Sequence, residues 1–275
     1  MPVARRTRGV ATAYAFGAAA AVVLFLSPLV LMVLGSLRRP GLPPPDGFDL
    51  VPVPARWENY LDVTTVVPLA QQLLNSVLIA AVAVPVTVLL ASWAGFALVT
   101  AGRRMRWWLL VVSLVALLVP PSALWVPRVV MFEAVGLTDH TLVAAAPALM
   151  ATTPFFVLLM ALAYRRIPSA LFDAAEVEGL SPYRTWRLVA FPQARAAAYA
   201  VGVLAFVFHW SNLVEPLLLL AREETWPASL GLRTLAAFEP TFYPLLLAAS
   251  VLVTVPAVLA FVLVQRAFFV RTLGG

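Results

Sequence analysis

Three acidic side chains, Asp173, Glu176 and Glu178, lie close together on one short stretch of the chain. Carboxylates grouped in this way can bind arginine guanidinium groups of another protein through charge-assisted hydrogen bonds. Two small residues, Ala174 and Ala175, lie among them, and small side chains allow another backbone to approach closely. The pattern therefore predicts a contact with a second protein. The alternative is a solvated amphipathic loop on lipid headgroups, although an anionic leaflet would repel three carboxylates.

The acidic stretch belongs to residues 165 to 195, which we expect to form two short helices outside the bilayer. Ser169 is a candidate cap for the first helix, and Gly179 can adopt the left-handed conformation that ends it. Ser181 is a candidate cap for the second helix, with Pro182 at its first helical position. The predicted docking residues are Asp173, Ala174, Ala175, Glu178, Gly179, Leu180, Ser181 and Pro182.

A second group of polar residues, His209, Trp210, Asn212 and Glu215, falls in an apolar stretch. Polar groups inside a membrane are costly unless partnered, and they often mark a transport path. Three of the four also have a purely structural explanation. His209 and Asn212 could bond within or between helices, and Trp210 could fill a helix interface rather than stack on a sugar ring.

Several classes of chemistry lack the residues they need. The chain has no cysteine and two separate histidines, so we expect no disulfide and no metal site. Every basic residue is arginine, which excludes a nucleotide-binding loop of the G-x-x-x-x-G-K-[ST] type and a Schiff-base lysine. No cofactor is expected in this chain, and ATP, if used, must be bound by another one.

The elements that position these residues are apolar helices. Of 275 residues, 62% are hydrophobic and 12% are charged, far from the composition of a soluble domain. Apolar runs long enough to cross a bilayer recur along the chain. We predict an all-α, polytopic membrane protein that forms one permease domain over residues 1–275. Its six spans are near 14–35, 75–97, 107–130, 142–164, 196–220 and 244–264.

The arginines set the expected orientation. With both termini in the cytoplasm, most arginines lie on the inner side, as the positive-inside rule requires. The exceptions are Arg38, Arg39, Arg56, Arg128, Arg222 and Arg233. Because the basic residues are spread between apolar spans, a nucleic-acid partner is not expected. The proline-rich external segment from about 36 to 74 is predicted to be extended.

The acidic stretch resembles the hallmark of permease subunits of ATP-binding cassette importers, E-A-A-x3-G-x9-I-x-L-P. The matching residues are Asp173, Ala174, Ala175, Gly179, Val189, Phe191 and Pro192, with Asp, Val and Phe as conservative departures. Other stretches resemble the carbohydrate branch of the maltose and glycerol-3-phosphate type, and within it the smaller permease partner. They begin at Trp57, Asn75, Gly102, Val119, Gly136, His209, Thr225 and Gln265.

The resemblance implies a transport subunit rather than an enzyme, located in a bacterial plasma membrane. It also implies a homologous second permease, two ATPase subunits that dock on the acidic stretch, and an external solute-binding protein. In the family the carboxyl-terminal tail reaches the ATPase, which here would involve Gln265 and Arg266. Those two residues could instead only anchor the last span.

Two rival functions belong to other classes. An ion- or proton-coupled secondary carrier would use Glu215 and His209 as a relay, but such carriers commonly contain inverted repeats, and none is evident here. An intramembrane enzyme would need a catalytic pair or a metal set within the spans, which the few polar residues do not supply. The ATP-driven importer is therefore preferred.

Overall fold

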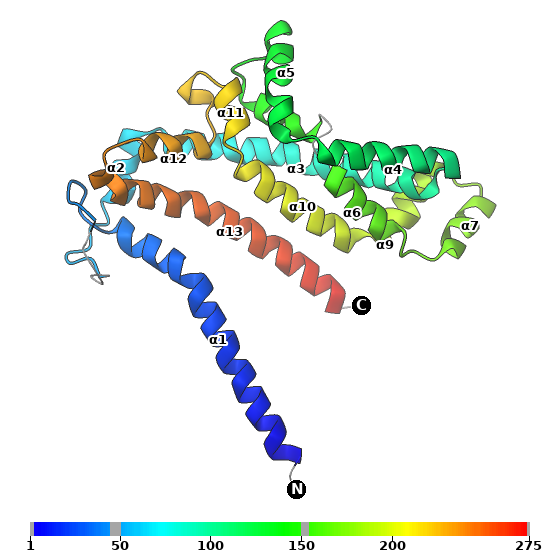
Figure 1. The fold of residues 1–275 in the computed structure, drawn as a ribbon, viewed down its shortest axis with the longest axis horizontal. Helices are drawn as coiled ribbons and strands as arrows, with labels where there is room; N and C mark the ends of the chain where they lie inside the picture. The colour runs from blue at the N-terminus through cyan, green and yellow to red at the C-terminus, as the bar shows by residue number, and fades with distance from the viewer. Residues whose placement is uncertain (1–2, 45–50, 150–153, 274–275) are drawn as a thin grey trace. The chain divides into compact units, whose positions relative to one another are not determined.

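The computed structural model describes residues 3–44, 51–149 and 154–273, and the regular structure within them is helical (Figure 1). The first helices are α1 (Val3–Ser36), α2 (Asn59–Val66), α3 (Leu69–Thr100), α4 (Arg103–Leu118), α5 (Pro121–Ala134), η1 (Thr141–Ala148) and α6 (Pro154–Tyr164). The later ones are α7 (Ser169–Val177), α8 (Pro182–Thr185), η2 (Trp186–Ala190), α9 (Phe191–Gln193), α10 (Arg195–Trp210), α11 (Val214–Leu219), η3 (Glu223–Thr225), α12 (Ala228–Ala236), η4 (Pro240–Phe242) and α13 (Tyr243–Leu273).

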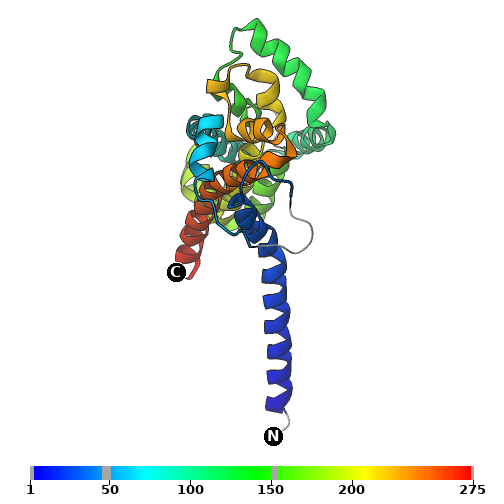
Figure 2. The ribbon, with the colours of Figure 1, turned by 90° about the vertical axis from the view of Figure 1, so that its left-hand side faces the viewer.

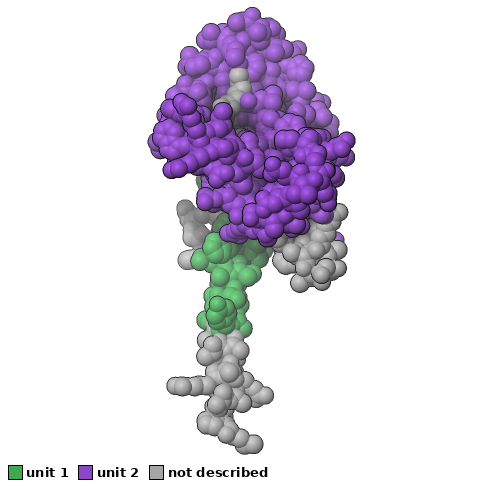
Figure 3. All heavy atoms as spheres, turned by 90° about the vertical axis from the view of Figure 1, so that its right-hand side faces the viewer, with its two compact units in different colours: residues 1–67, 232–255 green, residues 68–231, 256–275 purple. Residues whose placement is uncertain are grey.

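The chain forms two compact units, coloured separately in Figure 3. Unit 1 contains residues 1–67 and 232–255, and unit 2 contains residues 68–231 and 256–275. Helices α12 and α13 contribute residues to both units. The residues predicted to dock a partner or to line a transport path all belong to unit 2.

In unit 1 a polar contact holds the end of α1 against α2. The Asn59 side-chain amide donates to the carbonyl oxygens of Ser36 and Arg38 at 2.7 and 2.6 Å, and the Tyr60 hydroxyl bonds the Ser36 hydroxyl at 2.7 Å. These bonds satisfy carbonyls that a helix end leaves without partners. The prediction of an extended segment from about 36 to 74 is wrong for Asn59–Val66, which form α2, and for residues 69–74, which begin α3.

Unit 2 is built around α3, which packs against α6 and α10. The apolar cluster between them contains Met160, Tyr164, Val201 and Ala205, all fully buried. At Gly95 a Cβ atom would lie 2.8 Å from the Met160 Cβ, so only glycine allows α3 and α6 to approach this closely. Small residues thus set the spacing of the helices that carry the site.

Between three and six spans can be drawn through the described residues. Three uninterrupted segments, Tyr14–Ser36, Leu69–Thr100 and Pro240–Val262, are long and apolar enough to cross a membrane. Three bent helix pairs meet the same test: α4 with α5, α6 with α7, and α8–α9 with α10. The predicted all-helical membrane protein is confirmed at this level.

Several predicted spans contain breaks. The third runs across the 92° bend between α4 and α5, visible in Figure 2, where Pro120 and Pro121 remove backbone donors. The fifth is divided between α10 and α11 by residues 211–213. The fourth covers η1 and α6, with residues 150–153 outside the described residues. The apolar composition continues through these residues, so hydropathy alone does not show where one helix ends and the next begins.

Candidate functional site

The acidic stretch forms α7, a helix that leaves α6 at a bend of 83°. Its cap position is Pro168, in an extended conformation, and no side chain caps the helix. The prediction that Ser169 caps α7 is wrong, because Ser169 is already its first helical residue. The Pro168 carbonyl accepts a hydrogen bond from the Leu171 amide at 3.1 Å at the start of α7.

Gly179 ends α7 as predicted. Its φ angle of +70° lies in the left-handed region that favours glycine. The Gly179 amide donates to the Glu176 carbonyl at 2.9 Å, and the Leu180 amide donates to the Ala175 carbonyl at 3.0 Å. This pair of bonds is a Schellman motif, which satisfies the last carbonyls and fixes where the chain turns.

The second helix begins where predicted. The Ser181 hydroxyl accepts a hydrogen bond from the Arg184 amide at 3.4 Å, and Pro182 occupies the first helical position. Helix α8 continues through the π-turn η2 into α9, and the chain then bends by 83° into α10. Pro192 lies beside this bend, as the sequence predicts.

The exposed surface of α7 is acidic. Asp173, Glu176 and Glu178 are all exposed, and none forms an ion pair within the part of the chain that the structure describes. Ala174 is exposed beside them, whereas Ala175 is only 3% exposed. The expectation that both alanines leave an approachable backbone is therefore wrong for Ala175, which packs inward.

A polar cluster holds the second half of the loop against the helical core. The Ser92 and Tyr164 hydroxyls bond each other at 2.6 Å, and the Trp186 Nε1 donates to them at 2.8 and 3.2 Å. All three side chains are buried, and they come from α3, α6 and η2. Buried hydrogen bonds of this kind fix geometry, because losing one leaves a polar atom unpaired.

Aromatic rings extend this attachment. Trp186 packs at 5.5 Å from Trp93 and 5.4 Å from Phe191, measured between ring centroids. Phe172 of α7 lies 6.3 Å from Phe96 of α3. This cluster was not predicted from the sequence. Its signal was a serine in an apolar span together with aromatic residues that carry polar groups, all of which need partners when buried.

The predicted path residues are mostly occupied with partners in unit 2. Glu215 is buried in an ion pair with Arg128 of α5, and its other carboxylate oxygen accepts from the Asn212 amide at 2.9 Å. The His209 Nε2 lies 3.4 Å from the Thr87 hydroxyl. Arg128 was predicted to lie outside the membrane, and its pairing with Glu215 was not predicted. The signal was two opposite, lone charges in apolar surroundings.

Trp210 is the path candidate that lines a cavity. The cavity has a volume of about 980 Å³ and is bounded by α3, α10 and residues 256–261 of α13. Its walls are largely apolar, and Trp210 stacks on Phe206 at 5.1 Å. The structure therefore separates Trp210 from Asn212 and Glu215, which are not among the cavity-lining residues.

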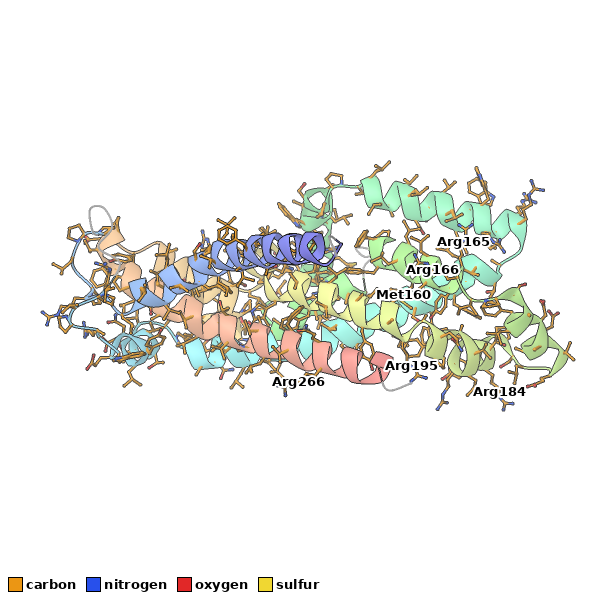
Figure 4. All side chains as sticks on the ribbon, turned by 90° about the horizontal axis from the view of Figure 1, so that it is seen from below. Met160, Arg165, Arg166, Arg184, Arg195 and Arg266 are labelled. Carbon is orange, nitrogen blue, oxygen red and sulfur yellow. The ribbon has the colours of Figure 1, made fainter. Side chains whose placement is uncertain are left out.

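The remaining candidates, Gln265 and Arg266, are exposed on α13. Figure 4 shows Arg266 on that helix, Arg165 and Arg166 at the end of α6, and Arg184 and Arg195 on the segments that follow. The side chains of residues 267–273 are outside the described part of the structure. A contact between the C-terminal tail and the ATPase therefore stays a prediction.

A second polar cluster joins the turn after α5 to the segment after α11. The Asp139 carboxylate accepts from the backbone amides of Ala221 and Arg222 at 3.1 and 2.9 Å and from the Thr225 hydroxyl at 3.0 Å. The Arg222 guanidinium also bonds this carboxylate. The backbone hydrogen bond from Arg222 is the main cause that lowers the pKa of Asp139 to about 2.

Comparison with known proteins identifies the family. Residues 84–272 match the family of binding-protein-dependent transport system inner membrane components. The chain belongs to this family. It is accordingly a membrane transport component rather than an enzyme, and the predicted relationship to permease subunits of ATP-binding cassette importers is confirmed. Membership in this family implies partner chains that bind the solute and hydrolyse ATP.

Individual relatives are similar over most of the chain. The lactose transport system permease protein of Rhizobium radiobacter is 30% identical over 73% of this chain and 72% of its own length. The arabinooligosaccharides transport system permease protein of Halalkalibacterium halodurans is 28% identical over 90% of both chains. A bacterial ABC transporter involved in the import of the acidic polysaccharide alginate has the same fold, with a TM-score of 0.73, 18% identity, and coverage of 98% of this chain and 99% of that one.

Proposed function

We propose that this chain is a permease subunit that imports a sugar or sugar-like solute across the bacterial plasma membrane. The similar permeases named for lactose and arabinooligosaccharides support a carbohydrate substrate. The single observation that carries the proposal is the exposed acidic face of α7, which has no ion pair within residues 3–44, 51–149 and 154–273 and lies beside the Schellman turn at Gly179. A charged face that forms no ion pair among the described residues is suited to dock another protein.

The proposed assembly contains a homologous second permease, two ATPase subunits and an external solute-binding protein. Residues 1–275 act as one permease domain with six spans, and both termini lie in the cytoplasm. Mg-ATP is bound by the ATPase subunits, because this chain lacks the lysine of a nucleotide-binding loop. This chain needs no cofactor of its own for such a role.

The coupling step is mechanical. An ATPase dimer can shift the equilibrium between two conformations of the permease only by the difference between its binding free energies for the two conformations. The docking residues Asp173 to Pro182 receive this force, and the Ser92–Tyr164–Trp186 cluster links the loop to α3 and α6. Because these contacts are rigid and buried, movement of the loop is passed to the helices rather than absorbed.

The secondary carrier remains the alternative, with Glu215 and His209 as its relay. The Arg128–Glu215 ion pair argues against it, because Arg128 already pairs with the carboxylate that the carrier would use as its relay. The C-terminal residues Gln265 and Arg266 are proposed as an additional ATPase contact. Trp210 is the preferred contact with a transported solute.

The test is co-purification and vesicle transport of the full assembly, comparing wild type with Asp173→Arg and Gly179→Asp. The first reverses a docking charge, and the second places a side chain at a left-handed position, at a cost of about 1–2 kcal/mol. We expect loss of ATPase binding and of ATP-dependent uptake, with both permease subunits still assembled.

The matched control is Glu133→Arg, which makes the same change of charge at an exposed residue of α5. It should retain ATPase binding and uptake. Normal docking and uptake in both loop variants would contradict the proposal. Uptake that persists without any ATPase would instead favour the secondary carrier.

A further inference from the structure

Helix α4 packs against α3 and α6 but buries none of its side chains fully. None of its 16 residues is buried, and large apolar side chains such as Val112, Val115 and Leu118 are 61%, 57% and 82% exposed. In a membrane protein, exposed apolar surface on a helix of this kind is covered by acyl chains. The apolar face runs from the arginine-rich start of α4 to the break before α5.

Three arginines and a tryptophan lie at the start of α4, at one end of this apolar face. A hollow of about 530 Å³ is lined by Arg103, Arg104, Arg106, Trp107 and Leu110. Trp107 and Trp108 are both more than half exposed, and their rings meet edge to face at 4.8 Å. Tryptophan in such a position is typical of the level of lipid headgroups.

The Arg106 side chain has hydrogen-bond partners in the described structure, whereas the side chains of Arg103 and Arg104 do not. The Arg106 guanidinium donates to the carbonyl oxygens of Val99 and Ala101 at 2.7 and 3.2 Å, so it closes the last turn of α3. The side chains of Arg103 and Arg104 have no hydrogen bond or ion pair within the described ranges. The sequence also contains no acidic residue between Asp62 and Glu133. No carboxylate between residues 62 and 133 therefore neutralises the positive charge of this hollow.

We propose that the hollow binds the phosphate headgroup of an anionic phospholipid, whose acyl chains lie along the exposed face of α4. Arg103 and Arg104 supply planar guanidinium groups, which match phosphate oxygens in charge and geometry. Trp107 packs against the glycerol region, and Arg106 keeps the end of α3 in place beneath it. The positively charged hollow adjoins the apolar face of α4. A phospholipid can contact both surfaces, whereas a free phosphate can contact only the charged one.

The test is lipid retention by the purified full-length transporter, measured by native mass spectrometry after exchange into phosphatidylglycerol, phosphatidylcholine or an equal mixture. Wild type is expected to retain phosphatidylglycerol in preference to phosphatidylcholine. Arg103→Gln with Arg104→Gln should lower that preference about fivefold for each arginine removed. Arg103→Lys with Arg104→Lys should retain part of it, because the charge is kept but the planar guanidinium donors are lost.

The matched control is Arg184→Gln with Arg187→Gln, an equal loss of charge at exposed residues of the loop. This pair should leave lipid retention unchanged. Equal losses in both glutamine pairs, or no lipid preference in wild type, would overturn the proposal. So would displacement of phosphatidylglycerol by inorganic phosphate, or loss of the ATPase with retention unchanged in Arg103→Gln/Arg104→Gln.

Discussion

The loop from Arg165 to Arg195 and the segment from His209 to Glu215 both carry polar groups beside apolar helices. In the loop, the carboxylates of α7 are exposed and without ion pairs among the described residues. In the segment, Glu215 is buried and bound by Arg128 and Asn212. The same residue types therefore lie in opposite environments within unit 2.

The difference separates binding from folding. An exposed carboxylate keeps its hydration, so it contributes little to stability and is available to a partner protein. A buried carboxylate is stable only with a paired charge and hydrogen bonds, so changing it disturbs the structure first. We therefore expect loop variants to lose coupling without unfolding, and segment variants to lose stability.

The largest effect is expected at Glu215. Glu215→Ala leaves the Arg128 charge buried without its carboxylate, which should destabilise the protein by about 3 kcal/mol. Thermal unfolding in detergent measures the change. The double variant Arg128→Met/Glu215→Met should recover much of the loss, because it removes both charges together.

The matching change in the loop is Asp173→Ala, which should leave the unfolding temperature unchanged. If Glu215→Ala were as stable as wild type but failed to transport, Glu215 would act in the path rather than in the fold. That result would remove the distinction between the two regions.

A smaller effect is expected at Trp186, where the loop meets the core. Trp186→Phe keeps an aromatic ring but removes the donor to Ser92 and Tyr164, at a cost of about 1 kcal/mol. We also expect ATP hydrolysis to continue with reduced uptake, because the loop is held less firmly. The control is Trp93→Phe, a half-exposed neighbour that packs against Trp186. Equal uptake in the two variants would argue against this linkage.

The smallest effect is a pH dependence at Asp139. Its pKa falls from an ordinary value of 3.8 to about 2 in the folded protein, so the ionised form is favoured by folding. This stabilisation is complete above about pH 4 and is lost as the pH falls towards 2. The stability difference between wild type and Asp139→Asn should therefore shrink over that range. A difference that stays constant with pH would show that the charge of Asp139 is not responsible.

Local features of the loop could be predicted from sequence because the signals act over a few residues. Gly179, Ser181 and Pro182 have the structural roles that their residue types favour. The Ser169 cap was wrong because Pro168 already provides the extended residue before the helix. Ala174 and Ala175 could not be distinguished, since helical spacing alone does not say which face meets the core.

Contacts between distant segments could not be predicted. Arg128 and Glu215 are 87 residues apart in the chain, and Ser92 meets Trp186 over 94 residues. A polar residue in an apolar stretch needs a partner, but the local sequence does not identify that partner. The breaks at Pro120 and after Trp210 were also concealed, because the apolar pattern continues through them.

The most direct test of the account uses cysteine crosslinking, since the chain has no native cysteine. Ala174→Cys and Ala175→Cys differ by one position, and the structure places the first side chain outside and the second inside. In the assembled transporter, with cysteines introduced on the ATPase surface, Ala174→Cys should form crosslinks and Ala175→Cys should not. Absence of crosslinks from Ala174→Cys, or equal crosslinks from both, would contradict docking through the exposed face of α7.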